Sequence, residues 1–147
     1  MKVHMMMSGI LMGLLVAGNV LAREGEGENK KAGHEAMPTS ISGIWGEIKE
    51  YEVILKEIID AGKFDKVHEA AFEIRDMVKA LSEKSTTLAP ENLENVKAGS
   101  KRVAEIADQL DKYGDAGDKT QTEEQFQRLT KTLGYIESQY STELLGK

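Results

Sequence analysis

The chain has 147 residues, of which 25 are acidic and 19 are basic, giving a formal net charge of -6, and it contains no cysteine. An acidic chain repels phosphate backbones and anionic lipid surfaces, so the composition argues against nucleic acid or a membrane surface as the main partner. The lack of cysteine excludes disulfides, zinc-thiolate sites, thiol catalysis and the Cys-x-x-Cys-His attachment of haem. The length fits one domain with one core.

Residues 1–22 are typical of a secretory signal peptide. Lys2 supplies a basic start, residues 5–20 are mostly apolar, and residues 20–22 form a small-x-small cleavage site. The apolar span is shorter than the ~20 residues that a bilayer crossing needs. We therefore predict a soluble periplasmic protein that begins at Arg23 after cleavage and has no stable membrane insertion.

The remaining chain divides into three parts. Residues 23–37 are rich in Glu, Gly and Lys and show no hydrophobic period, which predicts a flexible tether. Residues 38–142 carry four amphipathic segments separated by turn residues, and residues 143–147 are a short C-terminal tail.

The first two segments predict a helical hairpin. A hydroxyl of Thr39 or Ser40 can cap the first helix, and Gly62 suits the left-handed residue that ends it. The second helix is expected from Asp65, acting as its cap, to Leu81. The short link between them predicts antiparallel helices.

Two further helices follow. Pro90 suits the first turn of the third helix, and Gly99 would let a neighbouring backbone approach closely. Residues 114–118 predict a break, after which Thr120 and Glu123 have the spacing of a capping box. The apolar stripe of the fourth helix is predicted to contain Phe126, Leu129, Leu133, Ile136 and Tyr140. The whole pattern predicts an all-α, up-down-up-down antiparallel four-helix bundle.

The large aromatic side chains recur at helical spacing. We expect Trp45, Tyr51, Tyr113, Tyr135 and Tyr140 to lie in the core or at its rim. The alternative, that they mark a ligand pocket or a partner surface, remains open at this point.

Two segments, residues 55–67 (LKEIIDAGKFDKV) and residues 135–140 (YIESQY), carry a resemblance to a known family. The first resembles the first hairpin, and the second the last helix, of the cytochrome b562 family of periplasmic haem-binding four-helix bundles. In the family a Met of the first helix and a His of the last hold the haem iron, but Ile48 and Glu137 stand at these places here. The resemblance therefore implies the fold and puts haem binding in doubt.

A second resemblance concerns residues 34–45 (HEAMPTSISGIW). This segment is similar to the start of small exported proteins that accompany heavy-metal efflux systems in proteobacteria. The similarity implies a periplasmic role related to heavy-metal or envelope stress.

The candidate metal ligands are His34, Met37 and His68. Imidazole and thioether groups suit copper, so His34 and Met37, with Glu35 between them, form a compact candidate for weak transition-metal binding. The alternative is that they are ordinary residues of a solvated tether. His68 is a candidate pH sensor or ligand, or else an ordinary surface residue.

Nothing in the sequence predicts catalysis. The chain has no nucleophile triad pattern, phosphate-binding loop or dinucleotide fingerprint, so we expect no enzyme and no organic cofactor. We expect an accessory or binding protein whose partner is a periplasmic protein, a metal ion or a second copy of the chain. The alternatives are an electron-transfer cytochrome of the b562 type and a purely structural, self-associating bundle.

Overall fold

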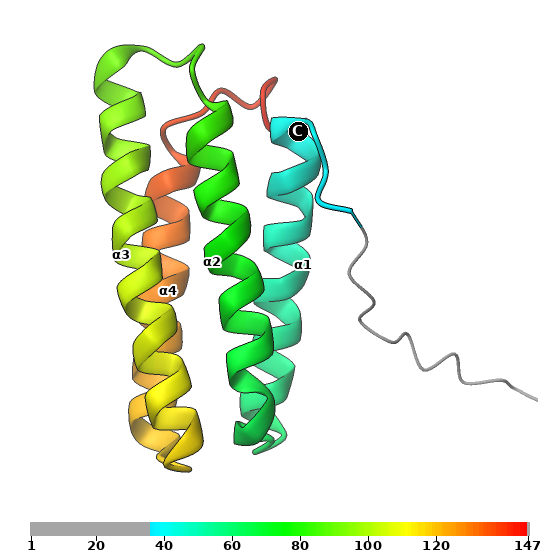
Figure 1. Ribbon diagram of the computed structural model, residues 1–147, viewed down its shortest axis with the longest axis vertical. Helices are drawn as coiled ribbons and strands as arrows, with labels where there is room; N and C mark the ends of the chain where they lie inside the picture. The colour runs from blue at the N-terminus through cyan, green and yellow to red at the C-terminus, as the bar shows by residue number, and fades with distance from the viewer. Residues whose placement is uncertain (1–35, 147) are drawn as a thin grey trace, which may run out of the picture. The chain divides into compact units, whose positions relative to one another are not determined.

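The computed structural model describes residues 36–146, and this part of the chain is all-helical, with four α-helices and no strand (Figure 1). The helices are α1 (Ile41–Asp60), α2 (Val67–Lys84), α3 (Pro90–Asp115) and α4 (Lys119–Glu137), and the short 3-10 helix η1 (Phe64–Lys66) precedes α2. The predicted signal peptide and most of the predicted tether lie outside the described residues. The prediction of an all-α chain with four helices is confirmed for the described part.

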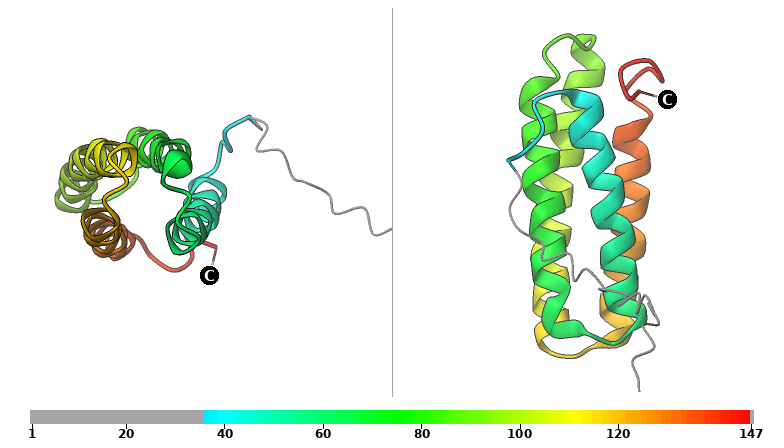
Figure 2. Two further views of the ribbon diagram at one scale, coloured as in Figure 1. Left: turned by 90° about the horizontal axis from the view of Figure 1, so that it is seen from below. Right: turned by 90° about the vertical axis from the view of Figure 1, so that its right-hand side faces the viewer.

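The four helices enclose one hydrophobic core. Each helix packs against the next in the chain, and α1 also contacts α4 more sparsely (Figure 2). The largest fully buried side chains are Ile44, Trp45, Ile48 and Leu55 of α1, Ile74, Met77 and Leu81 of α2, Ile106 and Leu110 of α3, and Leu129, Leu133 and Ile136 of α4. Each such side chain contributes about 1.5–3 kcal/mol when it leaves water, so burial of the four apolar stripes drives the assembly.

Three helix ends lie where the sequence predicts them. The hydroxyl oxygen of Ser40 accepts a hydrogen bond from the backbone N–H of Gly43 at 3.0 Å and so caps α1. Gly62 follows α1 with φ of +68°, a left-handed conformation that a side chain would disfavour. Pro90 is the first residue of α3, where its missing N–H costs no helical hydrogen bond.

The predicted cap of the second helix is wrong. Asp65 lies inside η1, and α2 begins two residues later at Val67 with no side-chain cap on its N-cap residue, Lys66. The chain turns through η1, and burial of Val67 then sets the start of α2. Tertiary packing therefore outweighs the local capping preference of an aspartate at this junction.

The predicted cap of the fourth helix is also wrong. Asp118 is the N-cap of α4, and its side-chain oxygen accepts a hydrogen bond from the backbone N–H of Gln121 at 3.1 Å. Thr120 consequently lies within the first turn of α4 and does not cap it. Asp118 directly follows Gly117, whose φ of +64° ends the preceding turn, so its carboxylate is the first acceptor available to the free amides.

The predicted break over residues 114–118 is confirmed, since α3 ends at Asp115 and α4 begins at Lys119, but Gly114 itself is still part of α3. It is buried within α3, and a Cβ atom added there would lie 3.0 Å from the backbone oxygen of Phe64 in η1. The glycine therefore permits a close approach between α3 and η1.

The segment after α4 joins the core. Tyr140 lies beyond the end of the helix that the sequence predicts to contain it, and it is nonetheless 8% exposed. Leu145, in the predicted tail, is 7% exposed and also belongs to the core. None of the helices between residues 36 and 146 is long and apolar enough to cross a membrane.

Candidate functional site

The structure places the candidate metal ligands as follows. His34 lies outside the described residues, and Met37 is exposed in the segment before α1. His68 is half-buried in the first turn of α2, and its ring meets the ring of Phe72 edge-on, with centroids 6.5 Å apart. Between residues 36 and 146, no three His, Cys, Asp or Glu side chains gather in a group that could hold a metal ion.

Met37 and His68 do not belong to one site. Met37 precedes α1 and His68 follows the other end of this helix, which has 20 residues. A helix of that length spans about 30 Å, whereas the ligands of one ion lie within a few ångströms of each other.

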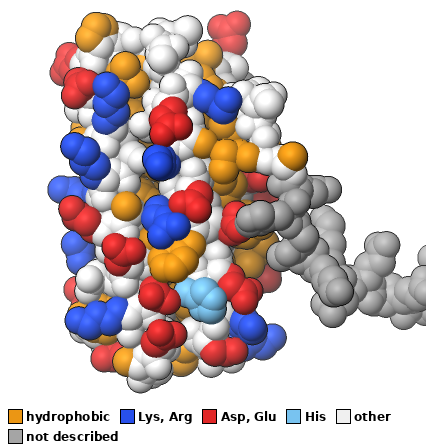
Figure 3. Space-filling view, in the orientation of Figure 1, with side chains coloured by type: hydrophobic (Ala, Val, Ile, Leu, Met, Phe, Trp, Pro, Cys, Tyr) orange, Lys and Arg blue, Asp and Glu red, His pale blue; other side chains and the backbone are white. Residues whose placement is uncertain are grey.

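His68 instead belongs to a surface stripe on α2. The guanidinium carbon of Arg75 lies 4.3 Å from the ring centroid of Phe72, and Arg75 also donates to the Asp76 carboxylate at 2.8 Å. That hydrogen bond is the largest cause that raises the pKa of Arg75. Figure 3 shows acidic and basic side chains interleaved on this face, as on an ordinary solvated surface.

The two positions of the resemblance that correspond to haem ligands hold very different side chains. Ile48 is fully buried among the apolar side chains of the core, and Glu137 is half-buried at the last residue of α4. Aliphatic carbon cannot coordinate iron.

The aromatic side chains divide into two groups. Trp45 and Tyr140 are buried, as predicted, and Tyr51 and Tyr113 are partly buried. Tyr135 is 48% exposed on α4, so it does not belong to the core, and the alternative of a ligand pocket stays open for it.

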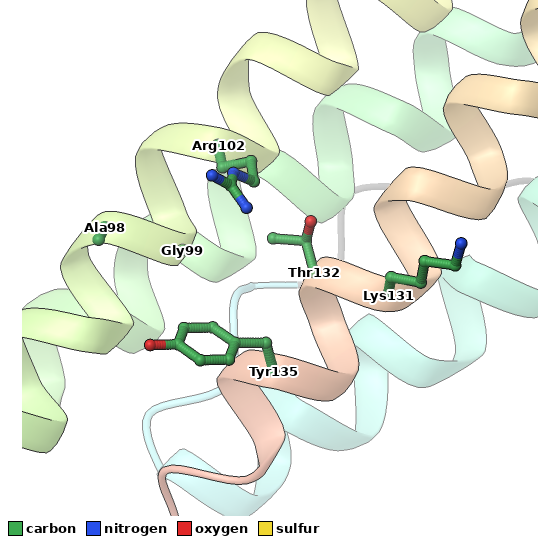
Figure 4. Close-up of a pocket in the computed structure, with 6 residues that line it drawn as sticks. All are labelled: Ala98, Gly99, Arg102, Lys131, Thr132 and Tyr135. Atoms are coloured by element: carbon green, nitrogen blue, oxygen red, sulfur yellow. The ribbon is translucent and has the colours of Figure 1, made fainter.

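Tyr135 forms one wall of a recess between α3 and α4. The recess has a volume of about 270 Å³ and is lined by Ala98, Gly99 and Arg102 of α3 and by Lys131, Thr132 and Tyr135 of α4 (Figure 4). The ring of Tyr135 extends toward α3 near Ala98, and the guanidinium of Arg102 extends toward α4 near Thr132. The ammonium group of Lys131 points away from both.

Gly99 forms the base of the recess, where α3 and α4 approach each other closely. A Cβ atom on Gly99 would lie 2.5 Å from Cγ1 of Ile136, so only glycine allows this close approach of α3 to α4. Ala98 beside it is exposed and adds a single methyl group. The small side chains of α3 thus leave a hollow between the longer side chains of Arg102 and Tyr135.

The recess carries uncompensated positive charge. Arg102 and Lys131 are both exposed, and neither forms an ion pair with any of residues 36–146. On α3, Lys97 pairs with Glu94 at 3.0 Å, whereas Lys101 and Lys112, like Arg102, form no ion pair with residues 36–146. The Arg102 guanidinium is therefore available to a negatively charged group that enters the recess.

The hydroxyl of Thr132 is already engaged. It donates its proton to the backbone oxygen of Arg128 at 2.9 Å. Thr132 therefore offers the recess only its methyl group and the remaining lone pair of its oxygen. Arg102 is left as the main donor that is directed into the space between the helices.

The comparisons with known proteins give no family. No family model matches the chain, and neither the curated proteins nor the solved structures contain a match to it.

Proposed function

We propose that this chain is an exported, non-catalytic accessory protein that binds its ligand in the recess between α3 and α4. In this proposal residues 1–22 are removed as a signal peptide, and the mature protein is a periplasmic up-down-up-down bundle built like those of the cytochrome b562 family. The short connections 61–66, 85–89 and 116–118 support this topology, because short loops join helices that are neighbours and antiparallel.

The observation that carries the proposal is the set of groups around the recess. Arg102 and Lys131 are cations without a partner among residues 36–146, and Tyr135 keeps almost half of its side chain in solvent beside them. Small-ligand sites are typically hollows lined by apolar and aromatic groups with a few polar ones, and the recess combines an aromatic ring and small side chains with the Arg102 guanidinium.

The packed interior argues against the alternative of a b562-type electron-transfer cytochrome. Ile48 and its buried neighbours fill the core, and neither Ile48 nor Glu137 is a usual axial ligand of haem. We propose that binding takes place on the outside of the helices.

Two measurements test this proposal. The full chain, expressed in a Gram-negative bacterium, should be released with the periplasmic fraction and should begin at Arg23. An Ala22→Arg variant is the control, because a bulky charged residue at the cleavage position should prevent processing. Titration of the purified protein with haem should then give no sharp Soret band. A sharp band would establish the cytochrome alternative, and unprocessed protein in the cytoplasm would contradict export.

A role in heavy-metal stress is a separate part of the proposal, which depends on the similarity of residues 34–45. If it holds, copper binding measured by calorimetry should weaken when His34 and Met37 are both replaced by Ala, because imidazole and thioether are the ligands that copper prefers. A His68→Ala variant serves as the control, since His68 lies beyond the far end of α1. Unchanged binding in the double variant would exclude the tether as a metal site.

A further inference from the structure

We propose that the ligand of the α3–α4 recess is a small organic anion with a carboxylate group on a flat ring. This inference rests on the proposed function in one respect, namely that the recess is a binding site. It adds the chemical class of the ligand, which follows from the size, walls and charge of the recess.

The size sets the first limit. A recess of about 270 Å³ is slightly smaller than the range of about 300–1,000 Å³ that is usual for drug-sized ligands. It has room for a single ring with one substituent, and it is too small for a nucleotide or for haem.

The walls set the second limit. Ala98, the Cα of Gly99, the methyl group of Thr132 and the ring of Tyr135 present carbon to the recess. Tyr135 is 48% exposed, so a flat apolar body that stacks on its ring would remove aromatic surface from water. This surface favours a planar ring over a fully hydrated inorganic ion.

The charge sets the third limit. The Arg102 guanidinium is a planar fork that matches the two oxygens of a carboxylate, and no carboxylate of residues 36–146 occupies it. The ammonium group of Lys131 points away from Arg102, so Lys131 contributes mainly its carbon stem and a more distant positive charge. Arg102 is therefore the group that recognises the anion.

The other polar groups that line the recess are not placed to donate a hydrogen bond to the carboxylate of this ligand. The Thr132 proton is donated to the Arg128 backbone oxygen, so Thr132 cannot donate to a carboxylate. The Tyr135 hydroxyl lies at the α3 side of the recess, away from Thr132. The ring of Tyr135, and not its hydroxyl, is the part that faces the ligand body.

The test is a titration of the full, isotopically labelled chain with benzoate, followed by backbone amide shifts in NMR spectra. We expect saturable shifts centred on Gly99, Arg102 and Tyr135, with a dissociation constant of about 1 mM, as is typical of so small a ligand. Benzamide, which has the same shape and no charge, should bind at least about tenfold more weakly. Inorganic phosphate should also bind more weakly, because it cannot stack on the ring.

Matched variants test the assigned roles. Arg102→Gln should weaken benzoate binding about tenfold or more, and Arg102→Lys should restore only part of it because lysine has no planar fork. Lys101→Gln, an exposed neighbour on α3 that does not line the recess, should bind as the wild type does. Tyr135→Phe should retain binding and Tyr135→Ala should lose most of it.

Four results would contradict the proposed ligand class. Absence of saturable shifts at the recess, equal binding of benzamide, equal binding of phosphate, or unchanged binding by the Arg102→Gln variant would overturn the proposed ligand class. These variants alter exposed side chains, and circular dichroism spectra confirm whether each one is folded. Saturable shifts at Gly99, Arg102 and Tyr135 with phosphate or benzamide as strong as those with benzoate would keep the recess as a binding site and overturn only the ligand class. No shifts there with any of the three compounds would contradict the recess as a binding site, and with it the proposed function.

Discussion

The hydroxyl oxygen of Ser85 lies 2.6 Å from the hydroxyl oxygen of Tyr140, and this bond joins the loop after α2 to the segment after α4. Ser85 donates its own proton to the backbone oxygen of Leu81, also at 2.6 Å. Tyr140 must therefore be the donor to Ser85, since a serine hydroxyl has only one proton. Both residues are buried, so the bond ties the C-terminal segment to the core.

Removal of this bond should destabilise the protein modestly. In a Tyr140→Phe variant Ser85 keeps its bond to Leu81, so no new donor is left unsatisfied. We expect the free energy of unfolding to fall by about 1 kcal/mol, the usual net value of one hydrogen bond, in urea titrations. Tyr113→Phe, which changes a half-buried tyrosine of α3 outside this bond, is the control and should unfold as the wild type does. Equal stability of the Tyr140 variant and the wild type would show that the bond contributes nothing.

The same pair predicts how stability depends on alkaline pH. Burial, the largest cause, raises the pKa of Tyr140 above the ordinary value of 10.0. Above about pH 10 the unfolded chain loses this proton before the folded chain does, and the free energy of unfolding falls as pH rises. Below that pH the contribution is fully present. The difference in stability between the wild type and Tyr140→Phe should therefore be constant up to about pH 10 and should narrow above it.

Tyr51 should also contribute to the fall in the free energy of unfolding at alkaline pH. Partial burial is the largest cause that raises its pKa, and the negative charges of Glu73, Glu47 and Glu50 raise it further. A Tyr51→Phe variant should thus lose stability less steeply than the wild type above about pH 10. Parallel pH profiles for the two proteins would argue against this contribution.

Replacing glycine by alanine should lower the free energy of unfolding at Gly99, where α3 contacts α4, and raise it at Gly134. A Cβ on Gly99 would lie 2.5 Å from Cγ1 and 2.9 Å from Cδ1 of the fully buried Ile136. Overpacking costs about 1–3 kcal/mol, which outweighs a gain of up to about 1 kcal/mol in helix propensity. Gly99→Ala should therefore lower the free energy of unfolding by about 1 kcal/mol, measured in urea.

Gly134→Ala is the matched control on the facing helix. Nothing lies within 4 Å of a Cβ at Gly134, so this variant should gain stability from helix propensity alone. In addition, combining Gly99→Ala with Ile136→Ala should cost less than the sum of the two single changes, because the second removes the clash. Additive costs would show that the methyl group introduced by Gly99→Ala fits without displacing Ile136.

The sequence predicts the helices well because their boundaries depend on local chemistry. Ser40, Gly62 and Pro90 act within one turn of the helix ends that they specify, so their roles are readable without tertiary information. The role of Gly114 is not readable in this way. It depends on the contact of α3 with Phe64 of η1, which lies about fifty positions away in the sequence.

The sequence does not predict the recess, because its walls come from two helices. Gly99 is recognisable as a point of close approach, yet the partner helix and its facing residues are known only from the structure. Tyr135 gives a misleading signal, since it occurs at a spacing that is compatible with the core of α4 and nonetheless points outward. An exposed aromatic residue beside an arginine without an ion-pair partner is visible only once the helix faces are assigned.

Trp45 tests how much a buried donor without a hydrogen-bond partner reduces the stability of the core. It is 2% exposed, and its indole N–H has no hydrogen-bond partner among the described residues. A buried donor without a partner costs about 1–3 kcal/mol, which offsets much of the packing that the large ring supplies. Trp45→Phe removes this donor and keeps an aromatic ring, so its free energy of unfolding should stay within about 1 kcal/mol of the wild type. Trp45→Ala, which leaves a cavity, should lose about 3–5 kcal/mol of the free energy of unfolding.

Unfolding of these variants is best followed by circular dichroism, since Trp45 is the only tryptophan of the chain. If Trp45→Phe were as destabilising as Trp45→Ala, the indole N–H would have to make a stabilising interaction in solution, such as one with a buried water molecule.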